Sequence, residues 1–447
     1  MAGPVELREF VCPSCGARTR LDARFVRWCL DCGYGADPNP PVLGKRAQRR
    51  AEREQTRALH MYESLRTARD LRPTSASGTA VTALAIVVHV VGFAVLAGPI
   101  WLVLATGWVP WADIVLLVGV LSFLSVRPRL TFRIPKQSPG IDREKAPKLY
   151  DLLDRCAAEL GCETPDRVLI ASEFNAATSR IPFRHYSLLR LGMPLWTVLS
   201  GPERIALLGH ELGHQVNGDP GQGNLVGSAR RSLVQWMKLL SPRQTPYERH
   251  RGRMIRRSGM VGLAEVFTPL VQAIVFLPFY LVAWGCGTLL TRLDLFCGQR
   301  AEYLADELGA RLAGSEAAGG LLGKLPLGAP VDTFVQTIRN NTRGERRSGS
   351  GAAAAADRGT QPDLWQRLRE FLDSIPETEK QRRRIVDKAH NTRTDSSHPA
   401  NHLRAALMHE RPQLPGTIKL SEDEWAGIDA ELAPAARAVA KALVGGR

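Results

Sequence analysis

The chain has few cysteines, only eight in 447 residues, and they lack the dense regular spacing of a disulfide-rich secreted protein. Four of them form two Cys-x-x-Cys pairs. The other four share no spacing, and we expect them to be small buried side chains (Cys156, Cys162, Cys286 and Cys297). The first forty residues contain no long apolar core, so we expect no secretory signal. These absences favour a reducing compartment and bound metal over a disulfide framework.

Charge is absent from one long segment, because no Lys, Arg, Asp or Glu occurs between residues 74 and 112. Within it, residues 79–105 are long enough to span about 30 Å of hydrocarbon as a helix rising 1.5 Å per residue. Residues 111–126 form a second, shorter apolar run. A buried hairpin of a soluble protein is the alternative, but the first run is too long and too apolar to favour it. The sequence therefore predicts a transmembrane helical hairpin over residues 74–127.

Elsewhere the chain is strongly basic, with a formal net charge of +15 and a pI near 9.8. Such charge suits nucleic acid or the inner face of an anionic membrane. Here the basic residues bracket the apolar runs, with Lys45, Arg46, Arg49, Arg50, Arg53 and Arg57 before them and Arg127, Arg129, Arg133 and Lys136 after them. By the positive-inside rule both flanks are expected in the cytoplasm. We predict a multi-pass cell-membrane protein. As its anionic partner we favour the lipid bilayer over nucleic acid.

A metal-binding pattern, His210-Glu211-Leu212-Gly213-His214, occupies a segment with helical periodicity. Histidines four residues apart lie one turn apart on the same face, so both imidazoles can reach one zinc ion. Glu211 points toward the same cavity and is placed to act as the general base of a metallopeptidase. Two ordinary buried or surface histidines are the alternative reading of this short motif.

A catalytic zinc site needs a third protein ligand. A third histidine six residues after His214 is excluded, since position 220 is Pro. Glu302 and Asp306, four residues apart in a predicted helix, offer carboxylates instead. One of them can bind zinc while the other orients a ligand histidine. A solvated helix face is the alternative for an acidic pair at this spacing.

Together, these motifs resemble the HtpX-like and CAAX-prenyl-protease-like family of integral-membrane zinc peptidases. Two further segments support the resemblance: Phe174-Asn175-Ala176-Ala177-Thr178, and Ser397-His398-Pro399 with Arg404 beyond it. The resemblance covers roughly residues 75–410. It implies that Glu302 is the third zinc ligand and Asp306 its supporting acid. It also implies that Asn175 and Ala176 contact substrate backbone on an edge strand, and that His398 and Arg404 line the cleft.

The chain departs from the family in two places. Ala400 stands where the family has a second proline, and only one apolar block, residues 261–290, separates the two zinc motifs. A single crossing would put Glu302 and His210 on opposite sides of the membrane, while two crossings need about forty apolar residues. We therefore predict a bent, re-entrant or interfacial hairpin there, with a basic loop at residues 243–257 on the cytoplasmic surface.

The amino-terminal pairs Cys12/Cys15 and Cys29/Cys32 are each followed by glycine. Four thiolates at this spacing close a tetrahedral site with no open position, which predicts a structural zinc ribbon. The ribbon either only folds around its metal or also binds a protein partner or nucleic acid.

The sequence thus predicts an α+β, mainly helical fold of the gluzincin type with transmembrane helices. The expected parts are a zinc ribbon (1–40), a basic helix or linker (41–73), the hairpin (74–127), a peptidase core (128–340) with the insert 261–290, a flexible linker (341–362) and a helical part that completes the domain (363–447). We predict a zinc endopeptidase with one catalytic and one structural Zn²⁺, acting on membrane or membrane-associated proteins, with ribbon and catalytic domain in the cytoplasm. The alternative is a non-catalytic membrane adaptor or regulator whose ribbon binds protein or nucleic acid.

Overall fold

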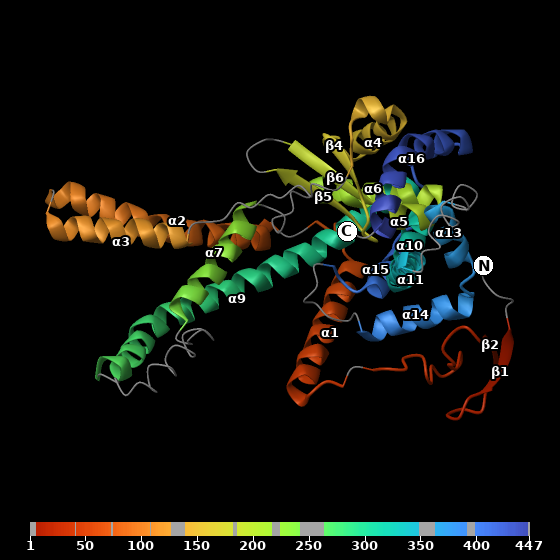
Figure 1. Cartoon of the computed structure of the whole chain (residues 1–447), viewed down its shortest axis with the longest axis horizontal. Coiled ribbons are helices and arrows are strands. Elements are labelled where there is room, and N and C mark those ends of the chain that lie inside the picture. The colour runs from red at the N-terminus through yellow and green to blue at the C-terminus, as the bar shows by residue number, and fades with distance from the viewer. Residues whose placement is uncertain are drawn as a thin grey trace. The chain divides into compact units, whose positions relative to one another are not determined.

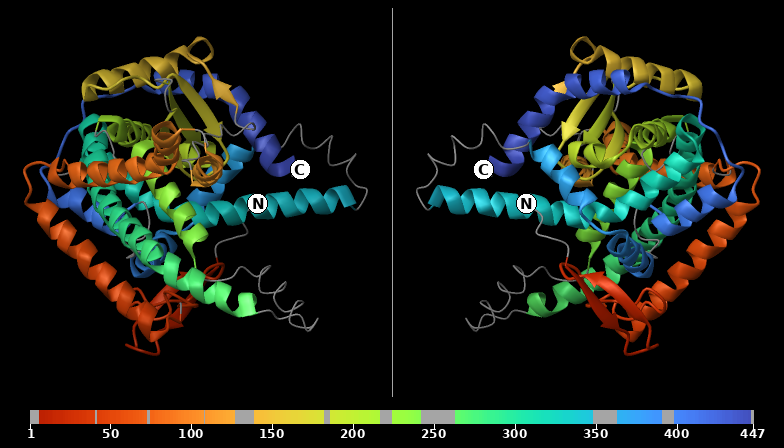
Figure 2. Two further views of the ribbon diagram at one scale, coloured as in Figure 1. Left: turned by 90° about the vertical axis from the view of Figure 1, so that its left-hand side faces the viewer. Right: turned by 90° about the vertical axis from the view of Figure 1, so that its right-hand side faces the viewer.

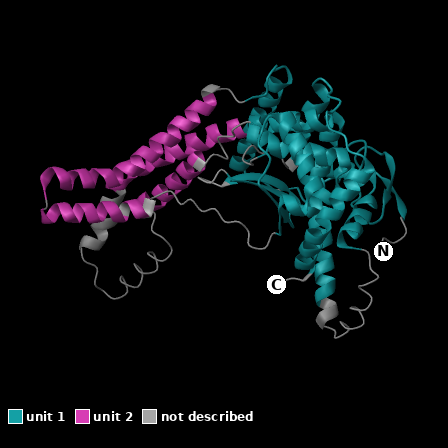
Figure 3. Cartoon of the chain, turned by 90° about the horizontal axis from the view of Figure 1, so that it is seen from above, with its two compact units in different colours: residues 1–72, 134–218, 299–447 teal, residues 73–133, 219–298 magenta. Residues whose placement is uncertain are grey.

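A computed structural model describes residues 6–40, 42–72, 75–107, 109–126, 139–181, 186–216, 224–241, 263–347, 363–390 and 398–445. Figure 1 labels most of the elements. The chain forms two compact units, each built from separate stretches of sequence (Figure 3). Unit 1 contains residues 1–72, 134–218 and 299–447, and unit 2 contains residues 73–133 and 219–298. The basic stretch at residues 127–136 lies outside the described residues.

A four-stranded sheet lies in unit 1, in the order β3 (Gly140–Ile141), β4 (Arg167–Ala171), β6 (Tyr186–Gly192) and β5 (Ala176–Ile181). The two central strands, β4 and β6, pair in parallel. β5 runs antiparallel to β6 and forms an edge of the sheet, as the resemblance implied. A Cβ on Gly192 would lie 2.3 Å from the Asn175 carbonyl oxygen, so only glycine lets the chain before β5 pack this closely.

Helices surround this sheet and supply most of unit 1, which confirms the predicted mainly helical α+β class. They are α1 (Lys45–Arg66), α4 (Pro147–Leu160), α5 (Met193–Val198), α6 (Gly201–Val216), α10 (Ser315–Lys324), α11 (Gly328–Arg347), α13 (Leu364–Asp373), α14 (Glu377–His390), α15 (Asn401–Glu410) and α16 (Glu422–Gly445). α4 and α16 lie side by side, and α16 also contacts β4 (Figure 2). Their apolar faces share one large core, in which Leu153, Leu208 and Leu368 are fully buried.

The carboxyl-terminal end of α9 (Leu263–Ala313) packs unusually closely against α6 within unit 1. A Cβ on Gly209 would lie 2.8 Å from the Gly309 Cα, and one on Gly213 would lie 3.1 Å from the Ala305 Cα. Side chains larger than hydrogen at Gly209 and Gly309 would push the two helix backbones apart. Glycine in the middle of the His-Glu-Leu-Gly-His helix thus brings α9 up to the histidines.

The amino-terminal ribbon (residues 6–40) consists of the antiparallel strands β1 (Leu7–Val11) and β2 (Arg18–Asp22) with two cysteine turns. Cys12, Cys15, Cys29 and Cys32 form one cluster whose sulfur atoms all lie within 4.8 Å of one another. The ribbon contacts the rest of unit 1 through Phe25, which packs against the main core, and through hydrogen bonds from two arginines. The Arg382 guanidinium donates to the Ala36 carbonyl over 2.6 Å, and that of Arg24 donates to the Ser374 carbonyl over 3.0 Å.

We expect Arg382→Met to loosen the ribbon from α14. Arg382 is buried, and it also binds both oxygens of the Glu379 carboxylate at 2.7 and 2.8 Å. Losing these charged hydrogen bonds should cost about 1–3 kcal/mol and raise hydrogen exchange in residues 6–40. Arg384→Met is the matched control, because Arg384 is an exposed residue of the same helix. Equal exchange in both variants would show that Arg382 does not hold the ribbon.

Unit 2 is a bundle of α2 (Ser75–Thr106), α3 (Pro110–Val126), α7 (Asn224–Leu240) and most of α9. Its small core includes Val81 and Val88 of α2, Leu233 of α7 and Leu290 of α9. The segments Ser77–Thr106 and Ile274–Ala313 are long and apolar enough to cross a membrane, and 17% and 11% of their most apolar windows are buried. Large apolar side chains therefore remain exposed along both helices. Such exposure is typical of helices in contact with lipid.

The prediction of a bent, re-entrant or interfacial hairpin at residues 261–290 is wrong. α9 instead continues as one helix for 51 residues, through Pro278 and on to Ala313. Proline removes one backbone hydrogen bond, but a helix still satisfies nearly every other backbone group in an apolar environment. The basic loop predicted at 243–257 lies outside the described residues.

The predicted linker at residues 341–362 begins too early, because α11 extends to Arg347. The Thr342 hydroxyl donates to the Ile338 carbonyl over 3.0 Å, which accommodates a polar β-branched residue in the last turns of the helix. The remaining linker residues, 348–362, lie outside the described part of the chain.

Candidate active site

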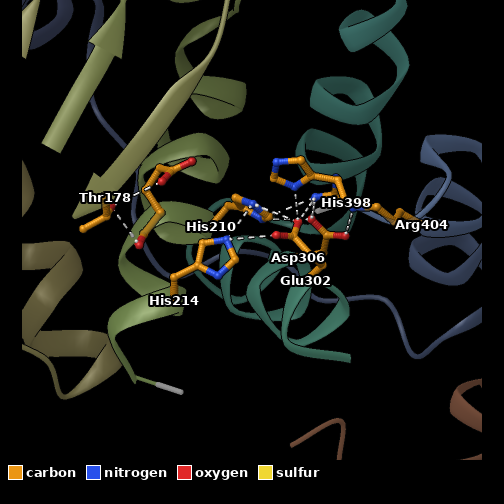
Figure 4. Close-up of polar contacts among 8 residues, drawn as sticks. Thr178, His210, His214, Glu302, Asp306, His398 and Arg404 are labelled. Atoms are coloured by element: carbon orange, nitrogen blue, oxygen red, sulfur yellow. Dashed lines mark hydrogen bonds and ion pairs between the residues drawn. The ribbon is translucent and has the colours of Figure 1, made fainter. Parts of the chain in front are cut away.

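Three functional side chains come from α6, where His210, Glu211 and His214 are each about 5–6% exposed. Apolar residues of the same helix, including Leu208 and Leu212, anchor it in the core. The histidines lie one turn apart, so both rings project from the same face toward α9 (Figure 4).

The carboxylate of Glu302 on α9 faces both histidines. Its oxygens lie 3.6 Å from His210 Nε2 and 3.4 Å from His214 Nε2, and the two Nε2 atoms are 3.2 Å apart. One ligand atom from each of the three residues lies within 4.8 Å of the other two. The structure thus brings together the three predicted zinc ligands from positions up to 92 residues apart in sequence.

The donor set fits a zinc ion. Burial lowers the pKa of His214 to about 4, which keeps its imidazole neutral at pH 7, as a metal ligand must be. A shared cation would stabilise the two Nε2 atoms, 3.2 Å apart, and the Glu302 carboxylate beside them. Two histidines and one carboxylate leave a position for water or substrate, as in catalytic zinc sites.

Asp306, one turn beyond Glu302 on α9, orients the first histidine. Its Oδ1 lies 3.0 Å from His210 Nδ1, so a proton on Nδ1 leaves Nε2 free to face the Glu302 carboxylate. Although burial disfavours charge on His210, the hydrogen bond and negative charge of Asp306 raise its pKa above the ordinary value. Asp306 therefore lies where the predicted supporting acid is needed.

Arg404 of α15 holds Asp306 in turn, with Nε and Nη2 donating to its two carboxylate oxygens over 2.7 and 2.6 Å. The guanidinium is 4% exposed, and Asp306 and Glu302 raise its pKa well above the usual range against the effect of burial. Arg404 was predicted to bind substrate. It borders the cleft, but both of these nitrogens bind Asp306, so its geometry favours positioning Asp306.

Glu211, between the two histidines, contacts the edge strand instead of the metal ligands. The Thr178 hydroxyl of β5 lies within donating distance of the Glu211 carbonyl oxygen, at 3.0 Å, and of its Oε2, at 3.2 Å. Burial, helped by the nearby negative charge of Glu302, raises the pKa of Glu211. A carboxylate with a raised pKa is a better proton acceptor than an exposed glutamate.

A cavity of about 270 Å³ opens against His210 and Glu211. Polar groups on its lining include Asn175, His398 and Arg404, and five leucines form an apolar part, namely Leu195, Leu207, Leu321, Leu322 and Leu325. His398 is half exposed, and its Nδ1 lies 2.8 Å from a Glu302 oxygen. Ala176 is buried in β5, where it pairs with Leu191 of β6.

The family model for peptidase family M48 matches residues 144–411, more than half of the chain. The chain belongs to peptidase family M48. The predicted resemblance to HtpX-like peptidases is thereby confirmed, and the protein is a metallopeptidase of a zinc-dependent family. No curated protein and no solved structure matches the chain. The ribbon cysteines lie outside the matched residues.

Sequence reasoning missed two features of this M48 peptidase. Thr178 was part of the quoted family segment but was given no role, although alternation along β5 puts it on the same face as Ala176. The five leucines of the cavity were also missed. Leu207 alone had a local signal, because it lies four residues before Glu211 and shares its helix face.

Replacing Asp306 with Asn should weaken zinc binding at the peptidase site about 10–100-fold, because the neutral amide accepts more weakly from His210. Competition with a chelator of known affinity measures this loss. Asp332→Asn is the control, since Asp332 is an exposed carboxylate of α11 in the same unit. Unchanged zinc affinity in Asp306→Asn would rule out its orienting role.

Proposed function

We propose that this M48 peptidase is a zinc-dependent endopeptidase that hydrolyses peptide bonds of membrane or membrane-associated proteins. One observation carries the proposal. Nε2 of His210, Nε2 of His214 and a carboxylate oxygen of Glu302 meet within 4.8 Å, beside the buried carboxylate of Glu211. A second ion at the four ribbon cysteines would be structural, because four thiolates leave no open position.

Zinc held by His210, His214 and Glu302 would supply a Lewis acid that polarises a peptide carbonyl and makes water a stronger acid. Glu211 accepts the proton of the attacking water and later delivers it to the departing amine. Asp306 keeps His210 in the tautomer that offers Nε2, and Arg404 fixes Asp306. His398, half exposed at the cleft, would donate to the oxygen of the reacting carbonyl.

The edge strand β5 offers a way to hold the substrate. Within the described residues β5 pairs only with β6, so its other edge can accept an extended peptide. Adding a strand there aligns the peptide backbone by main-chain hydrogen bonds. Asn175, at the start of β5 and on the cavity lining, would bind that backbone next to the zinc site.

The exposed apolar helices of unit 2 support a membrane location. We propose that α2 and α3 form a hairpin and that ribbon and peptidase lie in the cytoplasm, as the basic residues before α2 favour. Because His214 and Glu302 meet at 3.4 Å, the chain between them must return to its starting side.

Proteolysis by the detergent-purified full chain tests the proposal. We expect cleavage of unfolded membrane proteins or casein, loss of cleavage after chelation, and recovery with zinc. Metal analysis should give two zinc ions per chain, and one after Glu302→Ala. The result would instead support the non-catalytic adaptor if the chain cleaved no substrate and held only one zinc ion, which is lost when Cys12 and Cys15 are replaced.

The apolar part of the cavity predicts a preference for aliphatic side chains beside the cleaved bond. Peptides with leucine there should have a kcat/KM about 10–100-fold higher than peptides with alanine. Leu325→Ala should reduce this ratio. Leu420→Ala, which changes a partly buried leucine away from the cavity, should not. Equal cleavage of leucine and alanine peptides by the wild type contradicts the assignment.

A further inference from the structure

The helix α1 has one strongly basic exposed face that the peptidase site does not use. It contains seven basic and three acidic residues. Arg46, Arg49, Arg53 and Arg57 recur at intervals of three and four, so they form a single stripe along the helix. All four side chains are exposed.

The stripe arginines have no acidic partner among the described residues, unlike the other arginines of the helix. Two of the three acids on α1 are already engaged, since Glu54 binds Arg50 at 2.8 Å and Glu63 lies 3.5 Å from Arg66. The third acid, Glu52, is exposed and forms no ion pair with the four stripe arginines within the described part of the fold. They are available to an external anionic partner.

The other face of α1 is fixed to the body of unit 1. Ala58, Tyr62 and Leu65 are buried in the main core. At the carboxyl end of the helix, the Arg411 guanidinium donates to the carbonyl oxygens of Leu65 and Ala68 over 3.1 and 2.8 Å. The helix is thus held rigidly, and the stripe is presented without loss of backbone freedom on binding.

The sequence also limits how far this helix can be from the apolar spans. Only eight residues separate Arg66, the last residue of α1, from Ser75, the first residue of α2. Such a linker reaches at most about 30 Å when extended. A cluster of arginines next to the start of a membrane-spanning segment is the pattern that binds acidic lipid headgroups.

We propose that the α1 stripe binds the anionic headgroups of the membrane leaflet from which α2 enters the bilayer. The bound face is Arg46, Arg49, Arg53 and Arg57, and its ligand is the phosphate of acidic phospholipids. This inference rests on the proposed membrane location but not on peptidase activity. Exposed charges more than about 8 Å apart are largely screened at physiological salt. The stripe arginines must therefore contact the headgroups directly, and their binding must weaken as the salt concentration rises.

The test uses the full chain in lipid nanodiscs with a fluorescent amino acid at Thr56, an exposed position beside the stripe. Headgroup-labelled nitroxide lipid serves as the quencher. We expect about threefold stronger quenching in discs with one third phosphatidylglycerol than in phosphatidylcholine discs, and loss of the difference at high salt. Changing the four stripe arginines to Gln should remove the difference as well.

The matched control changes four exposed cations elsewhere in unit 1 to Gln, namely Lys145, Lys419, Arg437 and Lys441, and should keep the difference. A second fluorophore at Val90 of α2, with acyl-chain nitroxide, reports whether the spans enter the bilayer. Quenching at Val90 without a lipid-dependent change at Thr56 overturns the headgroup proposal alone. So does binding of duplex DNA through the stripe arginines without that change. No quenching at Val90 overturns the membrane location on which it rests.

Discussion

The Glu211→Gln variant is expected to lose peptide hydrolysis by a factor of about 10²–10⁴ while it keeps its zinc. Glutamine has nearly the shape of glutamate, so it can still accept the hydrogen bond from Thr178, but it cannot take a proton from water. Glu211 is not among the clustered metal-ligand atoms, so zinc content should stay at the wild-type value. Initial rates on a quenched fluorescent peptide and metal analysis of the same sample measure both quantities.

Glu316→Gln is the control for this experiment. Glu316 is an exposed carboxylate on α10, away from the cavity lining, and its replacement should leave the rate unchanged. A Glu211→Gln enzyme that cleaves as fast as the wild type would falsify the general-base assignment. Loss of zinc in that variant would show that Glu211 supports the metal site instead.

The second large effect is expected on stability, from Arg404→Met. This change leaves the Asp306 carboxylate, 3% exposed, without the guanidinium that binds both of its oxygens. Breaking a buried pair in this way costs about 3–5 kcal/mol, against a total stability of about 5–15 kcal/mol for an ordinary domain. Denaturant unfolding in detergent measures the loss.

Two further variants separate this pair from surface ion pairs. Arg404→Lys keeps the charge but not the two parallel hydrogen bonds, and should give an intermediate loss. Arg155→Met removes an exposed pair with Glu424, 3.4 Å long, and should cost less than about 1 kcal/mol. If Arg404→Met were as mild as Arg155→Met, the buried network would not hold α15 to α9.

Local sequence patterns predicted those parts of the fold that are determined by residues close together in the chain. The α6 helix follows from the helical periodicity around His210 and His214. The ribbon cysteines follow from ligand spacing. By contrast, the approach of α6 to α9 depends on Gly209 meeting Gly309, a contact between residues 100 positions apart. No local pattern contains that pairing, so Glu302 could be chosen over Asp306 as the ligand only by resemblance to the family.

The error at residues 261–290 has a different origin. The prediction counted apolar residues against bilayer thickness and treated prolines as breaks, whereas α9 continues through Pro278. Similarly, Thr178 could not be assigned from sequence, because its role depends on β5 lying beside α6. Its hydroxyl meets Glu211 only through that tertiary contact.

The most direct test of the central claim is an anomalous difference map recorded at the zinc edge from crystals of the full chain. We predict one peak about 2.0–2.2 Å from His210 Nε2, His214 Nε2 and a Glu302 oxygen. A second peak among the four ribbon cysteines serves as the internal standard. A cysteine peak with no density between the two histidines and Glu302 would contradict the proposed catalytic zinc site.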